Sequence, residues 1–566
     1  MTSGNQINRN VLRNKVILLM ILCLGGFGVL TMSSARKKPK AKQDSRVYLI
    51  HADELRYNAY GSYPPAQIVK GKVSFRHQGA TLTCDSAYFY QELNSVKAFG
   101  HVHYRQGDTL SLDCDHGDYD GQEQILRARK DVVLKHRKQT LYTDSLDYDR
   151  LYSNAYFFEG GRLIDGNERL SSDWGEYNTE MKQAVFYYNV RLTNGQRLIT
   201  TDTLYYDTNT SVAHVMGPSK ITQEKSVIDT EDGFFNTKTE QAQMYGRSTI
   251  VNDQKTITGD SLYYDDKTGE SEGVGNVIYI DKLNKNELQC GKLRYNEKTG
   301  YGFATIDALV KDFSQKDTLF MHSDSMKIFT FHINTDSVYR KVHCYNKVRA
   351  YRRDVQAVCD SLVFNSQDSC MTMYKDPIVW NMGRQLLGEE IRVYMNDSTV
   401  RMAHVLGQAL SVEKVDEEQH YNQISSKEMM AFFDNGAIRN AISIGNVCAI
   451  YYPIEEKDTS IIVMNYTETD TLKMYFTPER KLEKIWMPSA TGTWYPLTQI
   501  PPDKLLLPQF AWFEDIRPRD QFDVFSWRGK SEEAKLKVIE RHAAPLQTLD
   551  NQPPTENIIQ KSKTQR

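Results

Sequence analysis

Acidic residues recur along this 566-residue chain, each within the same short context. The clearest copy is residues 257–266, ITGDSLYYDD, in which Asp260 precedes Leu262, Tyr263 and Tyr264. A carboxylate close to a tyrosine could take part in general acid–base catalysis. However, no enzyme needs about fourteen copies of one catalytic acid. The repetition therefore favours a structural role, and we predict that each acid ties the backbone of a turn.

The other residue types that could do chemistry form no recognisable site. His101 and His103 share a predicted strand face, but no third ligand follows at metal spacing. The sequence contains no HExxH, CxxC, GxSxG or glycine-rich phosphate loop. A lyase or hydrolase would need one cluster of acids and bases on a single repeat, and none stands out. We therefore predict no enzymatic activity, no metal and no cofactor.

Four cysteines share one position of the repeat, immediately before the acid: Cys84, Cys114, Cys290 and Cys359. Other copies have Thr, Ser or Gly there, so the position requires a small side chain. Equivalent positions of neighbouring repeats should lie roughly 9–10 Å apart, because strands are spaced by about 4.8 Å. A disulfide requires Cα atoms within about 7 Å. We therefore predict that Cys84 and Cys114 are unbridged, which a non-reducing digest would test.

The acids mark a repeat with a period of 29 residues over most of its length. Looser copies precede them at residues 52–57 and follow at 427–433 and 470–476. A fixed period of this size indicates one repetitive body, stabilised by contacts between neighbouring repeats. The marker positions are Asp85, Asp115, Asp144, Asp173, Asp202, Glu231, Asp260, Gly291, Asp324, Asp360 and Glu389.

Each repeat contains two predicted strands. The marker strand is followed by a turn of Asn, Asp, Gly, Lys or Thr, and then by an apolar strand with a central glycine, such as residues 96–104, VKAFGHVHY. The aliphatic and the second aromatic residue of the marker strand are two positions apart, so they share one face. We predict that this face is the interior. These inner pairs are Leu146 with Tyr148, Leu204 with Tyr206, Leu262 with Tyr264, Leu293 with Tyr295, and Leu362 with Phe364.

Proline placement predicts where the sheet ends. Of 16 prolines, only Pro218 and Pro377 lie between residues 66 and 450. Proline is excluded from sheet interiors, so we expect continuous sheet from about residue 45 to 485. Within it, residues 46–300 are the regular repeats and residues 301–485 are more divergent.

The C-terminal part differs in kind. Residues 486–530 are rich in proline and aromatic residues and predict either a cap over the last sheet edge or a partner-docking segment. Residues 531–566 predict a short helix at 531–542, with Ser531 as N-cap, and a disordered tail.

The N-terminus predicts export. A basic start precedes a 17-residue apolar run at 16–32 and the small residues Ser33, Ser34 and Ala35. This pattern is typical of a signal peptide, and the run is also at the lower limit for a membrane anchor, so residues 1–35 are predicted as one or the other. A basic linker follows at 36–45. The net charge of −2 gives no support for nucleic-acid binding.

The repeated acid–small–Leu–x–Tyr strand, the apolar–Gly–x–Val strand after it and the export signal resemble the OstA-like (organic solvent tolerance A-like) proteins, over about residues 46–480. This family includes the periplasmic bridge component of lipopolysaccharide transport. The resemblance implies an all-β fold, an elongated twisted β-jellyroll of many antiparallel repeats. Its two facing sheets would be open along one edge as a V-shaped groove.

On this resemblance we predict a non-enzymatic lipid conduit in the periplasm, with residues 16–32 as its signal or its inner-membrane anchor. Lipid A acyl chains would bind to the inner pairs. The implied partners are other jellyroll transport proteins, joined through edge strands, and an outer-membrane transport barrel. About 66 residues follow residue 500, too few for a lipid-facing barrel in this chain. The alternative is a structural or adhesive β-solenoid of the cell envelope, with a packed interior and no lipid cargo.

Overall fold

The computed structural model describes residues 45–57, 65–195, 197–223, 226–252, 254–333, 335–381, 383–396, 399–416, 420–453, 461–479 and 481–529. These residues form antiparallel β-strands almost throughout, as predicted. They divide into two compact units, unit 1 ending at Arg129 and unit 2 beginning at Lys130. The predicted signal or anchor, most of the basic linker and the predicted helix at 531–542 lie outside the described residues. Within the described part, no helix has the length and apolar character needed to span a membrane.

Unit 1 is a stack of antiparallel strands that begins with a strand in two pieces. β1 pairs with one half of β3 and β2 with the other half. β3, β4, β5 and β6 then pair in sequence order. The strands are β1 Tyr48–His51, β2 Glu54–Tyr57, β3 Gln67–His77, β4 Ala80–Tyr90, β5 Ser95–Gln106 and β6 Leu110–Asp120, and β7 Ile125–His136 begins here and continues into unit 2.

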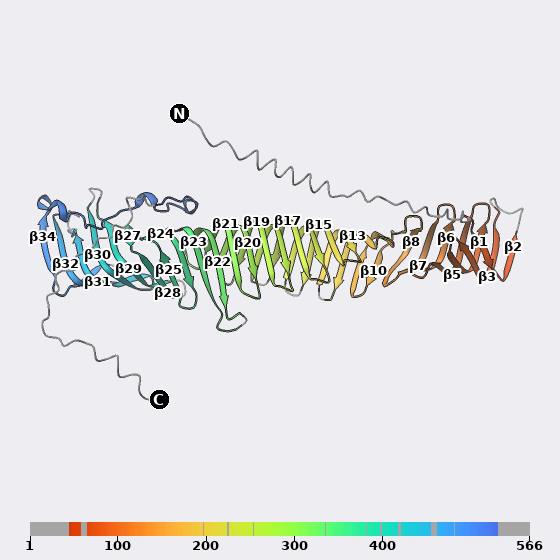
Figure 1. The fold of residues 1–566 in the computed structure, drawn as a ribbon, viewed down its shortest axis with the longest axis horizontal. Coiled ribbons are helices and arrows are strands. Elements are labelled where there is room, and N and C mark those ends of the chain that lie inside the picture. Colours follow the sequence, from red (N-terminus) through yellow and green to blue (C-terminus); the bar gives the residue numbers. More distant parts are fainter. Residues whose placement is uncertain are drawn as a thin grey trace, which may run out of the picture. The chain divides into compact units, whose positions relative to one another are not determined.

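Unit 2 continues the same pattern, and its strands follow one another in sequence order along one direction (Figure 1). Long strands alternate with places where a strand is broken into two short pieces. The earlier strands are β8 Gln139–Asp149, β9 Asn154–Phe157, β10 Gly161–Asp165, β11 Glu168–Ser172, β12 Trp174–Asn178, β13 Gln183–Asn194, β14 Arg197–Asp207, β15 Val212–Gln223, β16 Ser226–Asn236, β17 Gln241–Val251, β18 Lys255–Asp265, β19 Glu270–Asp281 and β20 Asn286–Asn296. The later strands are β21 Tyr301–Asp312, β22 Leu319–Phe331, β23 Tyr339–Arg352, β24 Val355–Asn365, β25 Cys370–Tyr374, β26 Ile378–Asn381, β27 Arg384–Leu387, β28 Glu390–Asn396, β29 Thr399–Lys414, β30 Tyr421–Asp434, β31 Ala437–Tyr451, β32 Val463–Phe476, β33 Leu482–Trp486 and β34 Thr491–Pro496.

A β-bulge near the middle bends the long strands and divides each into two halves. In β19, for example, the pairing register shifts between Val274 and Val277, and Gly275 and Asn276 between them have positive φ. Such a bulge inserts unpaired residues and turns the strand. Pro218 sits in the corresponding bulge of β15, where no ladder hydrogen bond is required of it. The two halves of the bent strands therefore form the two walls of a V.

The repeated acid has a different role from the one we predicted. Asp260 lies at the corner, where its carboxylate accepts hydrogen bonds from Asn276 Nδ2 at 2.8 Å and Arg247 Nη1 at 3.0 Å. The turn is tied by Asp265 instead, whose Oδ1 accepts from the backbone N–H of Thr268 at 3.0 Å. The prediction that the marker acid secures the turn is therefore wrong. The acid stabilises the bend, and the last residue of the motif stabilises the turn.

Replacing Gly275 by alanine should destabilise unit 2 more than the same change at Gly246. Both glycines have positive φ, +78° and +71°, so each alanine should cost roughly 1–2 kcal/mol of backbone strain. A Cβ at Gly275 would also lie 2.6 Å from Asp260 Oδ2, whereas one at Gly246 meets nothing within 4 Å. Thermal unfolding of the two variants measures the difference, and equal melting temperatures would contradict the tight corner.

The sheet extends to Pro496, beyond the predicted end at about residue 485. β33 and β34 pair with the two halves of β32, so together they make the last strand in two pieces. The prediction placed the end of the sheet too early. Pro488 lies in the connection between the two pieces and Pro496 lies at the strand end, and at both places proline removes no ladder hydrogen bond.

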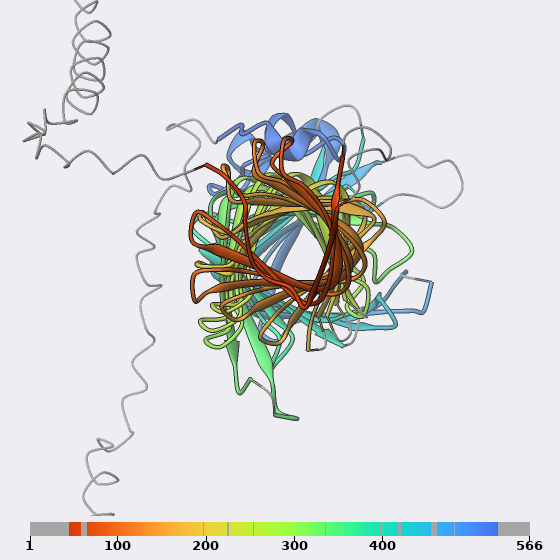
Figure 2. The same ribbon diagram turned by 90° about the vertical axis from the view of Figure 1, so that its right-hand side faces the viewer.

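The segment after the sheet, residues 497–529, is here called the C-terminal strap. It contains four short 3-10 turns, η1 Leu497–Gln499, η2 Pro502–Lys504, η3 Glu514–Ile516 and η4 Asp523–Phe525. Figure 2 shows this blue segment on the outside of the strands. It contacts β30 through Gln423, β27 through Gln385 and β23 through Arg349. The predicted cap over the last sheet edge is therefore wrong, because the strap runs back across the outer faces of earlier strands.

Buried amides hold the strap by its backbone. Gln385, on β27, donates to Ala511 O and accepts from Phe513 N, both at 2.8 Å. Gln423, on β30, repeats the pattern, donating to Leu505 O at 3.1 Å and accepting from Leu507 N at 2.9 Å. Both glutamines are completely buried, so each amide replaces its lost water contacts with two strap hydrogen bonds.

An apolar cluster lies between the strap and the sheet. Strap residues Leu507, Phe513 and Ile516 pack with Trp380 and Val412 from the strands. Arg349 is completely buried beside this cluster and donates to Ile516 O at 3.0 Å and to Asp523 O at 3.2 Å. The strap is therefore an integral part of unit 2.

Seven cysteines in the described residues carry free thiols, including Cys84 and Cys114. Burial raises the pKa of Cys114 to about 12. The Cys114 thiol is consequently protonated at neutral pH and behaves as a small apolar side chain.

Candidate functional site

The five predicted pairs all lie on the inner face of the bent strands. Leu204 is opposite Phe186 and Val215, and Tyr206 is opposite Ala184 and Ala213. The ring of Tyr206 thus faces small residues on both neighbouring strands, whereas Phe364 faces Val342 and Met371. Large and small side chains alternate along this row, so the rings can interdigitate across the narrow interior.

The inner side chains form one continuous apolar row through unit 2. Pairing carries it strand by strand from Tyr177 and Ala184 to Tyr206 and then Ala213. Further along, Tyr264 is opposite Ala242 and Ser271. This row is the candidate surface for apolar ligands, and its role in lipid binding stays a prediction.

The V has a mouth, bordered by two rims. Each marker strand begins at the first rim and ends at the second rim. The first rim therefore contains the turns before the marker strands, and the second rim contains the turns after them. His136 ends β7 on the first rim, and Tyr177 stands one residue before the end of β12 on the second. Side chains at the rims therefore decide whether the interior is open to solvent.

In the first part of unit 2 the mouth is closed. Tyr148 and Tyr206 are each 1% exposed, although both belong to a rim, and Leu146 and Leu204 beneath them are completely buried. Burial raises the pKa of Tyr206, with the nearby Glu168 carboxylate adding to the effect. We refer to this stretch, β8 to β15, as the closed section.

From β16 onward several inner rim residues become accessible, although Leu288, Met321 and Ala350 in the same row are at most 8% exposed. Ile199 is 1% exposed, but the equivalent Ile228 and Ile257 are only partly buried. On the other rim the same change occurs between Tyr206 and the half-buried Tyr264 and Tyr295. We refer to the stretch from β16 to β30 as the open section. Leu262, Leu293 and Leu362 remain buried at its base, beneath a rim that includes Phe364.

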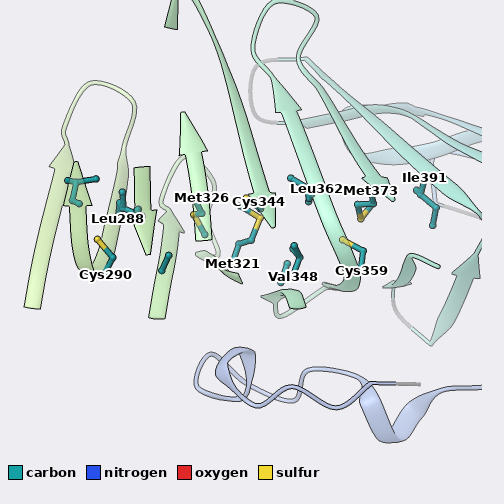
Figure 3. Close-up of a cluster of buried hydrophobic side chains, with 14 of the residues drawn as sticks. Leu288, Cys290, Met321, Met326, Cys344, Val348, Cys359, Leu362, Met373 and Ile391 are labelled. Carbon is teal, nitrogen blue, oxygen red and sulfur yellow. The ribbon is translucent and has the colours of Figure 1, made fainter. Parts of the chain in front are cut away.

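The base of the open section is rich in sulfur. Figure 3 shows Cys290, Met321, Met326, Cys344, Cys359 and Met373 lying along the interior between Leu288 and Ile391. Methionine is unbranched and polarizable, so it adapts its shape to its surroundings. In the closed section the counterparts of Cys290 and Cys359 are Thr143, Ser172 and Thr201, and the counterpart of Met326 is Leu204. The open section is therefore both more accessible and more adaptable.

The candidate chemical groups do not come together. His101 bonds to Asp85 at 2.7 Å, whereas His103 contacts Asp113 on another strand. Across the described ranges, no three potential His, Cys, Asp or Glu ligands gather around a common point. The histidines are thus engaged with separate carboxylates on the outer surface.

Comparisons with known proteins address the repeat directly. The sequence matches the family described as "OstA-like protein" over residues 44–202 and 188–260. This stretch of the chain is OstA-like. The OstA-like match ends in β18, although the same strand pattern continues to Pro496. No curated protein matches the sequence.

Among solved structures, the chain is similar to LptH from Pseudomonas aeruginosa, described as the LptA-homologous periplasmic component of the lipopolysaccharide transport device. The sequence identity is 14%, and the alignment covers 21% of this chain and 82% of that chain, with a TM-score of 0.18.

Sequence reasoning missed the rim residues that close the mouth. His136 and Glu168 were not singled out, because they lie outside the marker motif. One signal was available: His77 and His136 each end a strand immediately before a turn, in FRHQG and LKHRK. The partners they meet are about 40 residues away, and the repeat pattern alone does not pair them.

Proposed function

We propose that this OstA-like chain is a non-enzymatic component of lipopolysaccharide transport in the periplasm. Its open section takes up the acyl chains of lipid A. The observation that carries the proposal is the continuous apolar inner row, whose rim becomes accessible at Ile228, Ile257 and Tyr264. LptH, to which the chain is similar, is described as a component of that transport device.

The energetics favour an apolar groove for this cargo. Each methylene kept out of water is worth roughly 0.8 kcal/mol, so an acyl chain gains from every strand it lies against. Because the repeats present similar apolar surfaces, the binding free energy of the lipid should be similar at each repeat along the groove. A single inner substitution should therefore weaken transport only slightly.

The proposed partners are jellyroll transport proteins and an outer-membrane transport barrel. Unit 1 begins with β1 and β2, whose pairings within the described residues are all to β3. Their outer edge thus presents unpaired backbone groups, a template for strand addition. Residues 16–32 are proposed as a signal peptide or an inner-membrane anchor.

Photo-crosslinking tests the cargo. A benzophenone amino acid at Tyr264 or Tyr295 should yield lipopolysaccharide adducts in cells, because both rings border the open section. The matched control is Tyr263, the neighbouring residue on the opposite face of β18. Adducts at Tyr264 and Tyr295 that exceed those at Tyr263 at least tenfold would support the groove. Equal or absent labelling at all three positions would contradict it.

A structural or adhesive solenoid is the second candidate, and the closed section favours it. Its inner residues, such as Leu146 and Leu204, are as buried as an ordinary protein core. In that case the protein extracted with mild detergent should carry no lipid in native mass spectrometry. Co-purifying lipid A would favour the conduit.

A further inference from the structure

Hydrogen bonds cross the closed mouth at two places in unit 2. In unit 2 the Tyr177 hydroxyl is 2.9 Å from His136 Nδ1, and the Tyr206 hydroxyl donates to Glu168 Oε2 at 3.1 Å. Thr237 donates to the other oxygen of Glu168 at 2.5 Å. We refer to these bonds as the seam.

Each bond of the seam joins the two rims. Glu168 begins β11 on one rim, whereas Tyr206 stands next to the end of β14 on the other. The bonded residues are 38 to 69 positions apart, so they connect different repeats. Unit 1 contains an equivalent bond, from the Tyr119 hydroxyl to His77 Nδ1 at 2.6 Å.

The seam ends at the start of the open section, with Thr237 just after β16 as its last member. The Tyr264 hydroxyl donates to Asp266 Oδ1 at 2.8 Å, just beyond the end of its own strand, and does not reach the opposite rim. Phe235 replaces the tyrosine in β16 and has no hydroxyl to offer. The end of the seam therefore coincides with the first accessible inner residues.

The interior beneath the closed mouth has no room for an acyl chain. Leu146, Tyr148, Leu204 and Tyr206 are at most 1% exposed. In unit 1 the space beside His77 and Tyr119 amounts to about 10 Å³, enough for one water. Any lipid in these stretches must move the rims apart.

We infer that the seam is a gate: lipid enters the open section freely, and the rims joined by Tyr177–His136 and Tyr206–Glu168–Thr237 must part before it occupies the closed section. The inference rests on the proposed function. Parting exchanges seam hydrogen bonds for bonds to water, so the bonds resist opening only modestly. The acyl chain would replace the apolar contacts that the inner leucines and tyrosines lose.

Locking the seam tests the gate. In the full chain, with Cys448→Ser to remove a half-buried native thiol, His136→Cys and Tyr177→Cys are joined by a short bis-maleimide. A direct disulfide is not used, because the two long side chains place their backbones too far apart. The control joins Arg169→Cys and Thr193→Cys, which are directly opposite on one wall and outside the seam.

The measured quantity is the yield of photo-crosslinked adducts with purified lipid A at two inner leucine positions. A diazirine amino acid at Leu293 reports the open section, and one at Leu204 reports the closed section. Locking should lower the Leu204 adduct at least tenfold and leave the Leu293 adduct unchanged, and the Arg169/Thr193 lock should change neither. An undiminished Leu204 adduct in the locked protein would overturn the gate while leaving the proposed function intact. Loss of both adducts on locking would also overturn it, because the open section would then not fill independently.

A gentler variant covers the case in which the crosslinked protein misfolds. Tyr206→Phe keeps the ring and removes the seam hydroxyl, so labelling at Leu204 should rise severalfold. Tyr279→Phe, an inner tyrosine outside the seam, should not change it. Unchanged labelling in Tyr206→Phe would count against the gate. The absence of lipid A adducts at Leu293 in every variant would overturn the proposed function itself.

Discussion

Replacing Arg349 by alanine should release the C-terminal strap and lower the free energy of unfolding by roughly 3 kcal/mol, because removing one partner of a buried charged pair is strongly destabilising. The side chain is completely buried, and burial lowers its pKa to about 10, so it remains charged at neutral pH. Its loss leaves Ile516 O without this donor and removes one of the charged partners of Asp523. Limited proteolysis should then cut within residues 497–529, where the wild type resists.

Arg353 provides the matched control for this experiment. It is four residues away, its side chain is 76% exposed, and it pairs with Asp317 at 3.1 Å. Exposed ion pairs contribute about 0–1 kcal/mol, so Arg353→Ala should leave both stability and protease resistance nearly unchanged. If Arg349→Ala also behaved like the wild type, the strap would not depend on this side chain.

A second large effect is expected at the first strand of unit 1. Leu55 and Tyr57 lie on the inner face but are 54% and 58% exposed, whereas Val69 and Phe89 in the same rows are 0% and 5% exposed. Among the residues that the structure describes, no strand covers this end of the apolar row. A partner strand added there would cover both side chains and complete the next layer.

The double substitution Leu55→Asp and Tyr57→Asp should therefore abolish end-to-end pairing and leave the chain folded. Two carboxylates would have to be buried without partners at the new interface. With a photo-crosslinking residue at the exposed Tyr48, the wild type should form a protein adduct in the cell envelope, and the variant should lose at least nine-tenths of it.

Leu151→Asp is the corresponding control, because Leu151 is similarly exposed but lies in a turn, away from the edge. This change should leave the adduct intact. An undiminished adduct in the Leu55/Tyr57 variant would mean that β1 and β2 are not the pairing edge.

The repeat made the strands and their inner faces predictable. An aliphatic and an aromatic residue two positions apart must share a face, and Leu204 with Tyr206 does so. The bend between the two halves of each long strand was not predicted. It depends on consecutive residues with positive φ, such as Gly275 and Asn276, rather than on the hydrophobic pattern. For the same reason Asp260 was assigned to the turn, when it stabilises the corner.

The division into a closed and an open section could not be predicted from the sequence repeat. Leu204 with Tyr206 and Leu262 with Tyr264 look equivalent in sequence, and the difference between them comes from rim partners in other repeats. The position of the strap on the sheet could not be predicted for a different reason. Gln385 and Gln423 occupy outward positions where a polar residue normally indicates solvent, and only the distant backbone of the strap explains their burial.

The strap also has a consequence for biosynthesis. Its residues follow every strand that they cover, so the outer faces of β23 to β30 stay bare until the strap has been made. A chain interrupted after β32 would contain all the long strands but would expose Trp380, Ile378 and Leu410, which are completely buried in the finished protein. Large bare apolar patches favour aggregation. The strap therefore acts as a check on synthesis of the sheet, since only translation through the strap yields a chain with a covered surface.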